Sequence, residues 1–196
     1  MKRSPLTALA FGLTGIAFFL YPTIRPSTDS AATIASDGWL YGHLAAMLGF
    51  VLLGLGVLGL YERLGDRLAL RAAAVTWIGA GLTLPYYGAE DFGLGVIARH
   101  YPDAALKLAE EFRYAPVPVT MFAAGLALLG VGAVMAAVAV WRSGSLVKWS
   151  AVPLAAGFAL FIPQFFGPYS LRIAHGVLIA VGGLWLAFEL WRTRKA

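Results

Sequence analysis

Hydrophobic residues fill six long segments of this chain, and polar residues gather in the connections between them. A bilayer core of about 30 Å is crossed by roughly 20 helical residues, and each segment approaches that length. The segments cover residues 6–24, 39–61, 69–88, 117–141, 149–166 and 172–191. The pattern predicts an all-α, polytopic integral membrane protein in which residues 1–196 form one domain, a bundle of six transmembrane helices.

The segments lack the strict alternation of apolar and polar residues that marks the strands of a membrane barrel. Helices are the other structure that satisfies every backbone polar group in lipid. Composition agrees, since 60% of the residues are hydrophobic and 13% are charged, whereas about 25% of a soluble domain is charged. The lipid bilayer is therefore the first expected partner.

The six segments resemble three hairpins of one kind. The odd-numbered segments reach Pro22, Pro85 and Pro163 at their far ends, while even-numbered segments close with an aromatic and a basic residue, as in Trp141-Arg142. The similarity indicates either a repeated hairpin or interface chemistry common to all membrane helices. Each proline is expected to kink or stop its helix, because it removes a backbone donor.

Two connections on the side opposite the termini differ in kind. Residues 22–38 are rich in Ser, Thr, Ala and Asp and are predicted to be a flexible loop. The connection 89–116 is too long for a simple link, and Pro102 is suited to open a helix there. Residues 103–114 carry helical periodicity, so we expect an amphipathic helix on the membrane surface, acting as a lid or as a shield.

Basic residues are unequally divided between the two sides, which explains the net charge of +5 without a nucleic-acid partner. The side that holds both termini carries ten: Lys2, Arg3, Arg63, Arg67, Arg71, Arg142, Lys148, Arg192, Arg194 and Lys195. Positive residues favour the cytoplasmic side, so a multi-pass protein with both termini in the cytoplasm is predicted. The Ala- and Gly-rich composition favours a bacterial inner membrane. Cysteine is absent, which excludes disulfides and thiolate chemistry.

Residues 54–59 read Gly-Leu-Gly-Val-Leu-Gly and match the dinucleotide-binding fingerprint. The match lies in the middle of an apolar segment with no preceding strand, so that function is rejected. Glycines at such spacing let membrane helices approach closely. Stripes of this kind serve packing within the bundle, or association with a partner subunit or a second copy.

Several polar residues lie near the far ends of the segments, where they form the candidate ligand-binding site. They are His43, Tyr86, Tyr87, Glu90, Asp91, Gln164, Arg172 and His175. Ionisable residues within a membrane are a functional-site hypothesis by default, and His43 is expected about 6 Å below the level of Trp39. The alternative is structural: Arg172 reaches the interface, and Glu90 and Asp91 pair with Arg172 or Arg113.

Three classes of function follow. The first is a protein that binds or helps to transport a small amphiphile, lipid or prosthetic group in an outward-facing pocket; in one variant His43 and His175 are the axial ligands of a haem. The second is a membrane-embedded hydrolase in which His43, Glu90 and His175 hold a divalent metal. The third is an accessory structural subunit of a larger membrane complex. No sequence motif assigns a reaction.

Overall fold

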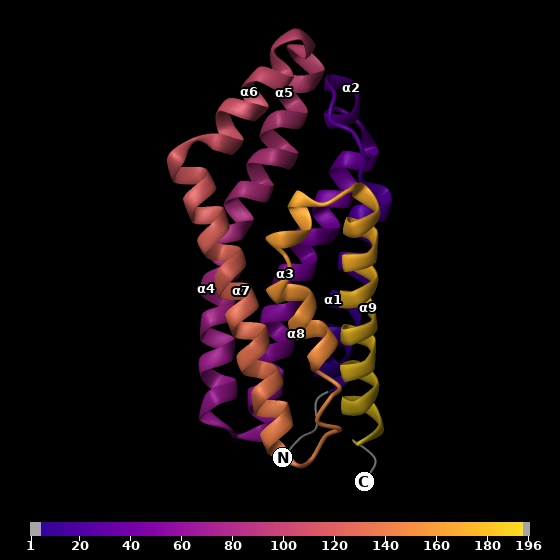
Figure 1. Ribbon diagram of the computed structural model, residues 1–196, viewed down its shortest axis with the longest axis vertical. Helices are drawn as coiled ribbons and strands as arrows, with labels where there is room; N and C mark the ends of the chain where they lie inside the picture. The colour runs from indigo at the N-terminus through magenta and orange to yellow at the C-terminus, as the bar shows by residue number, and fades with distance from the viewer. Residues whose placement is uncertain (1–4, 194–196) are drawn as a thin grey trace.

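The computed structural model describes residues 5–193, and every regular element in this range is a helix (Figure 1). Five helices are long and apolar enough to cross a bilayer. They are α1 (Pro5–Ile24), α3 (Asp37–Leu64), the continuous helix Arg67–His100, α7 (Pro116–Ser143) and α9 (Tyr169–Arg192). An all-helical fold with helices of this length and composition fits an α-helical membrane protein.

The helix Arg67–His100 contains three elements. α4 (Arg67–Gly88) runs into a π-helical segment, η1 (Ala89–Gly93), and then into α5 (Leu94–His100). The remaining elements are short: α2 (Ala31–Ile34), α6 (Pro102–Tyr114), α8 (Val152–Ala159) and the 3-10 helix η2 (Pro163–Phe166). α5 and α6 pack as a hairpin that extends beyond the other helices (Figure 1).

The helices close into a ring. α1 packs between α3 and α9, α4 packs between α3 and α7, and α8 completes the ring between α7 and α9. Figure 1 shows both termini at one end of the molecule. The chain therefore returns from the end of α7 through α8 and η2 toward the opposite end, which we call the distal end.

Aromatic rings fill the centre of the ring of helices. Phe18 of α1 lies at the middle of this core, and its ring centroid is 4.9 Å from that of Phe50, 5.1 Å from that of Phe158 and 5.6 Å from that of Phe161. These side chains come from α1, α3, α8 and the turn after α8, so the core joins both halves of the chain.

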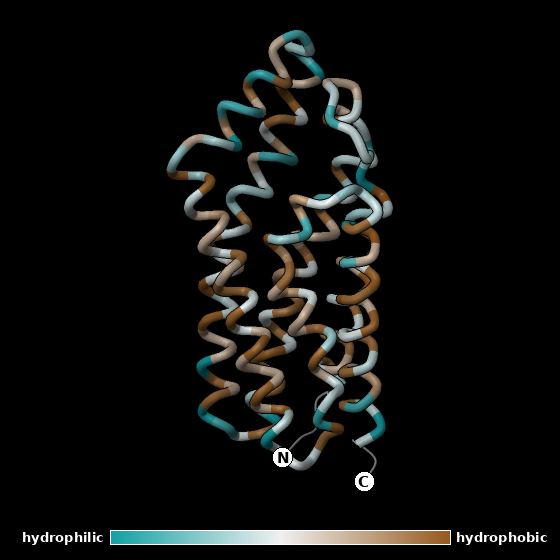
Figure 2. The backbone as a smooth tube through the Cα atoms, viewed as in Figure 1, coloured by the Kyte–Doolittle hydropathy of each residue, from teal (hydrophilic) through white to brown (hydrophobic). Residues whose placement is uncertain are grey.

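The outer surface of the long helices is apolar. Leu48 is 60% exposed, Ile78 56% and Phe188 62%. Figure 2 shows hydrophobic residues along the length of the bundle and hydrophilic residues at its two ends. Such a surface suits contact with lipid. Lipid tails are as apolar as these side chains, so burying the side chains inside the protein would bring no hydrophobic stabilisation.

The glycine motif at 54–59 lies within α3 and serves helix packing, as predicted. A Cβ atom on Gly54 would lie 2.8 Å from the Trp77 ring of α4, and one on Gly56 would lie 3.1 Å from Phe11 of α1. Small residues are therefore required where α3 meets both neighbours.

The predicted helix over residues 149–166 differs from the structure. α8 has eight residues, which span about 12 Å at 1.5 Å per residue. The helix ends at Ala159, a turn follows, and Pro163 opens η2. Proline lacks an N–H to donate to a preceding carbonyl, so the apolar composition of this segment does not produce one continuous helix.

Two other expectations need correction. The third segment does not stop near Pro85, because α4 contains that residue and continues through η1 and α5 to His100. A proline is tolerated in a membrane helix where local adjustments satisfy the carbonyl that it leaves without a hydrogen bond. Residues 22–38, expected to be a flexible loop, contain the short helix α2 between the end of α1 and the start of α3. Ser30 and Thr33 form reciprocal capping bonds at α2, with the Thr33 N–H 3.1 Å from Ser30 Oγ.

Candidate functional site

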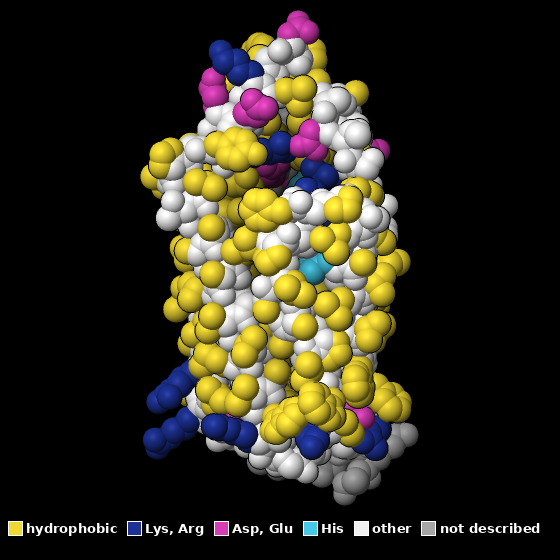
Figure 3. Space-filling view, viewed as in Figure 1, with side chains coloured by type: hydrophobic (Ala, Val, Ile, Leu, Met, Phe, Trp, Pro, Cys, Tyr) yellow, Lys and Arg dark blue, Asp and Glu magenta, His cyan; other side chains and the backbone are white. Residues whose placement is uncertain are grey.

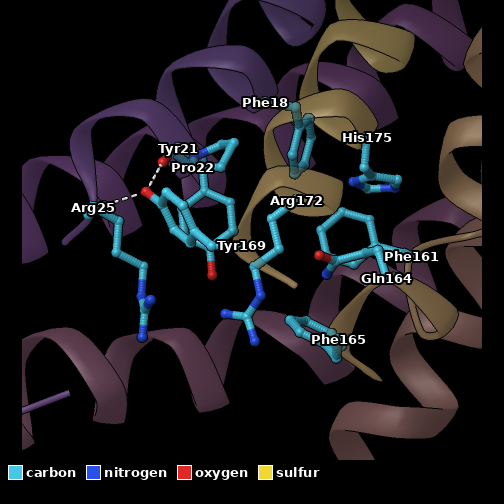
Figure 4. A pocket seen from close by; sticks show the side chains of 10 residues that line it. All are labelled: Phe18, Tyr21, Pro22, Arg25, Phe161, Gln164, Phe165, Tyr169, Arg172 and His175. Atoms are coloured by element: carbon cyan, nitrogen blue, oxygen red, sulfur yellow. Dashed lines mark hydrogen bonds between the residues drawn. The ribbon is translucent and has the colours of Figure 1, made fainter. Parts of the chain in front are cut away.

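A recess at the distal end lies between the last turns of α1, the η2 segment and the start of α9 (Figure 4). Its lining residues are Phe18, Tyr21, Pro22, Arg25, Phe161, Gln164, Phe165, Tyr169, Arg172 and His175. Its enclosed volume is about 10 Å³, which is room for one water molecule. The recess therefore combines aromatic walls with several polar groups.

The short α8 explains why the recess exists. Since α8 ends at Ala159, the distal part of the wall between α7 and α9 has no regular α-helix, and η2 covers it incompletely. Figure 3 shows a hollow at the distal end, beside the α5–α6 hairpin, with acidic and basic side chains on its walls. The acidic side chains there do not belong to the lining of the recess. The membrane-facing surface below it on the same face is mostly hydrophobic.

His175 stabilises the end of α8. Its Nε2 lies 2.7 Å from the carbonyl oxygen of Gly157, and a carbonyl accepts, so Nε2–H donates. The N–H of Phe161, which would bond to this carbonyl if the helix continued, instead bonds to Phe158 O at 3.3 Å. His175 thus satisfies one of the carbonyls that a helix leaves free at its C-terminus.

Tyr169 fastens α9 to α1 beside the recess. Its hydroxyl faces the carbonyl oxygens of Pro22 and Arg25, and the distance to the latter is 2.7 Å (Figure 4). Both carbonyls lie at the C-terminal end of α1, where backbone acceptors lack intrahelical partners. The hydroxyl therefore fixes one wall of the recess.

A network of four charged residues lies next to the recess. The Arg113 guanidinium binds Glu90 through two nitrogens, at 2.5 and 2.9 Å, and binds Asp29 at 2.7 Å. Asp29 also accepts a hydrogen bond from Arg25 at 2.7 Å. This network links η1, α6 and the segment before α2, and its two positive and two negative charges balance.

The charges in this network support one another. Burial raises the pKa of Asp29, but the positive charges of Arg25 and Arg113 lower it by more, so that the pKa of this carboxyl lies below its usual value. Burial opposes the charge of Arg113, yet its bonds to Glu90 and Asp29 raise the pKa of the guanidinium above its usual value. Asp29 and Arg113 therefore each favour the charged form of the other at neutral pH.

Trp39 of α3 contacts two members of the charged network, Glu90 and Arg25. Its indole Nε1–H donates to the backbone oxygen of Glu90 at 3.0 Å, and the Arg25 guanidinium lies 4.3 Å from its ring centroid. His43, one turn later, has its Nδ1 2.8 Å from Trp39 O and packs among the rings of Tyr21 and Tyr87. His43 is buried among aromatic rings and is not among the residues that line the recess.

The structure separates the predicted site residues into groups. Gln164, Arg172 and His175 line the recess, whereas Glu90 belongs to the charged network. Tyr86 stacks on Phe122 with centroids 4.1 Å apart. The remaining two, Tyr87 and Asp91, are buried outside the recess.

Glu90 pairs with Arg113, one of the two partners proposed from the sequence, but Arg172 forms no ion pair with Glu90 or Asp91 within the described residues. Sequence reasoning did not identify Arg25 and Asp29 as members of a site. The two residues form an ion pair at a spacing of four, but the chain between them is not helical, so no helical pattern in the sequence signals the pair.

The metal and haem hypotheses do not gain support from this geometry. No group of three or more His, Asp or Glu residues within 5–193 is placed to hold a metal ion. His43 and His175 are each bonded through one ring nitrogen to a backbone carbonyl, and only His175 lines the recess.

Comparison with known proteins does not assign the chain to a family. No protein-family model matches it, and no curated protein or solved structure matches it.

Proposed function

We propose that this chain is an integral membrane protein that binds a small amphiphile in the recess between α1, η2 and α9. The observation that supports this function most is the composition of the recess, in which Phe161 and Phe165 form apolar walls and Gln164 and Arg172 supply polar groups. Small-molecule sites are typically concave and mostly apolar, with a few polar groups that orient the ligand.

We further propose that the chain crosses the membrane six times, the sixth crossing being the interrupted segment made of α8 and η2. Both termini lie at one end in Figure 1, which favours an even number of crossings. Ten of the fifteen basic residues belong to the side of the termini, so the termini are cytoplasmic and the recess opens outward. The Ala- and Gly-rich composition favours a bacterial inner membrane.

Entry of a ligand requires the recess to widen, and η2 is the element best suited to move. Its backbone is held by few hydrogen bonds, among them Phe165 N–H to Ile162 O at 3.1 Å and Gly167 N–H to Gln164 O at 3.4 Å. A 3-10 helix has poorer hydrogen-bond geometry than an α-helix. The core around Phe18 and the charged network stay fixed on either side.

Two adjacent phenylalanines allow a matched test of this function. Phe165 lines the recess, whereas Phe166 is 87% exposed and is not a lining residue. The purified protein in nonionic detergent is titrated with dodecanol and dodecanoate, and 1:1 adducts are counted by native mass spectrometry. Removing a phenyl group from an apolar wall costs about 1.5–3 kcal/mol, so Phe165→Ala should weaken binding at least about tenfold.

Phe166→Ala is the control and should leave the affinity unchanged. Non-saturating adducts with both amphiphiles would contradict the proposed function, as would equal affinities for the Phe165→Ala and Phe166→Ala proteins.

A further inference from the structure

The recess has an unbalanced positive charge. Two arginines line it, and none of its lining residues is acidic. Arg25 is neutralised by Asp29 at 2.7 Å and also donates to Pro26 O at 3.0 Å. Arg172 is different, because no ion pair of this residue exists within the described chain. Its guanidinium carbon lies 5.6 Å from the ring centroid of Phe165.

Burying an arginine at this position costs free energy unless an anion binds to its guanidinium. Arg172 is half-buried near the distal end of a helix long and apolar enough to span a membrane, and a charged group removed from water needs a partner of opposite charge. Figure 4 shows the side chain extending from α9 toward Phe165, on the side of the recess that η2 borders. The missing partner is therefore expected on the open side of the recess.

The neighbouring groups favour an anion rather than a cation. Gln164 is buried and lines the recess, and its amide can donate to an oxygen of a bound anion. The N-terminus of α9 has no side-chain cap, so its backbone N–H groups add positive potential beside Arg172. A planar guanidinium binds the two oxygens of a carboxylate or phosphate in a fork.

We propose that the recess selects amphiphiles with an anionic head group, a carboxylate or a phosphate, whose oxygens pair with the guanidinium of Arg172 while the apolar chain lies against Phe161 and Phe165. This inference rests on the proposed function and adds the chemical class of the ligand to it. A single-chain amphiphile is favoured over a two-chain lipid, because the enclosed space is small.

The test uses amphiphiles with one chain length and different head groups. Dodecanoate, dodecyl phosphate, dodecanol and dodecyltrimethylammonium are titrated at pH 8 into the full-length protein in nonionic detergent, with 1:1 adducts counted by native mass spectrometry. Dioctanoylphosphatidylglycerol is a further arm that separates a lipid head group from a free single-chain anion. The two single-chain anions should bind at least about tenfold more tightly than dodecanol, as expected for one charge-assisted hydrogen-bonded pair.

Arg172→Gln should remove this preference while the affinity for dodecanol stays the same, so dodecanol also reports that the variant is folded. Arg172→Lys should restore part of the preference, since it keeps the charge and loses the fork. The control is Arg99→Gln, an exposed arginine of α5 outside the recess, which should keep the full preference.

Two results would overturn the inference alone: an anion preference that survives Arg172→Gln, or saturable binding of all head groups with similar affinity that Phe165→Ala weakens. Tighter binding of the two-chain lipid than of dodecanoate would overturn the single-chain assignment. Failure of every amphiphile to form a saturable adduct would instead contradict the proposed function itself.

Discussion

Glu90 and Asp91 are adjacent in the chain and equally buried, yet their surroundings differ. Glu90 is 5% exposed and binds Arg113 through both carboxylate oxygens. Asp91 is 4% exposed, and neither of its carboxylate oxygens has a hydrogen-bond partner within the described residues. Both residues belong to the π-helical segment η1, but Glu90 joins the charged network and Asp91 does not.

This difference predicts opposite outcomes for the same isosteric change. Glu90→Gln leaves the buried Arg113 with a weakened partner, and breaking a buried ion pair costs about 3–5 kcal/mol. Asp91→Asn removes a charge that no partner compensates, so stability should be unchanged or higher. Thermal unfolding in detergent, followed by tryptophan fluorescence, should show a lower midpoint for Glu90→Gln only. Comparable losses in both variants would contradict the assigned roles.

Individual site residues could be predicted from the sequence only in part. Polarity and a position near the ends of apolar segments indicate Gln164, Arg172 and His175, and these three residues line the recess. The sequence does not indicate Arg25, because its role depends on how the chain folds over Trp39. His43 is buried outside the recess, since depth along a helix does not reveal which side a residue faces.

At the scale of the elements, hydrophobic length predicts α1, α3, α7 and α9 to within a few residues of their ends, whereas the helix that begins at Arg67 continues to His100, beyond the predicted end at residue 88. The interrupted segment was beyond such reasoning. Its composition is as apolar as that of a continuous span, but Pro163 and the bond from His175 to the Gly157 carbonyl favour an early end to α8. Tertiary contacts thus override local hydropathy at the place where the recess forms.

The contact between α4 and α7 requires glycine at one position and not at another nearby. A Cβ atom on Gly79 would lie 2.8 Å from both the Gly125 oxygen and the Leu129 nitrogen, which are backbone atoms of α7. Gly81, two residues later in α4, has nothing within 4 Å of such an atom. The two positions differ in packing while they share the same helix.

Gly79→Ala should therefore destabilise the protein, because α4 and α7 must separate; overpacking of this kind costs about 1–3 kcal/mol. Gly81→Ala should be neutral or stabilising by up to about 1 kcal/mol, since alanine is the better helix former. The comparison is made from thermal unfolding midpoints in one detergent. If Gly81→Ala lowered the midpoint as much as Gly79→Ala, the close approach of the two helices would not explain the glycine.

At the scale of the whole molecule, the two ends differ in charge and in structure. Figure 3 shows Lys and Arg side chains around the end of the termini, and acidic and basic side chains together at the distal end. The charged network, the α5–α6 hairpin and the recess are all distal. The proposed orientation, with this end outside the cytoplasm, would expose the recess to ligands from the outer side.

The proposed orientation can be tested with single cysteines, because the chain contains none. Lys107 of α6 has an 80% exposed side chain at the distal end, and Ser145 is exposed in the connection between α7 and α8, at the end of the termini. In intact cells a membrane-impermeant maleimide should label Lys107→Cys and should reach Ser145→Cys only after permeabilisation. The reason is that ten of the fifteen basic residues belong to the latter side, and such an excess favours the cytoplasm. The opposite labelling pattern would invert the protein in the membrane and place the recess on the cytoplasmic side. The cysteine-free protein is the control for background labelling.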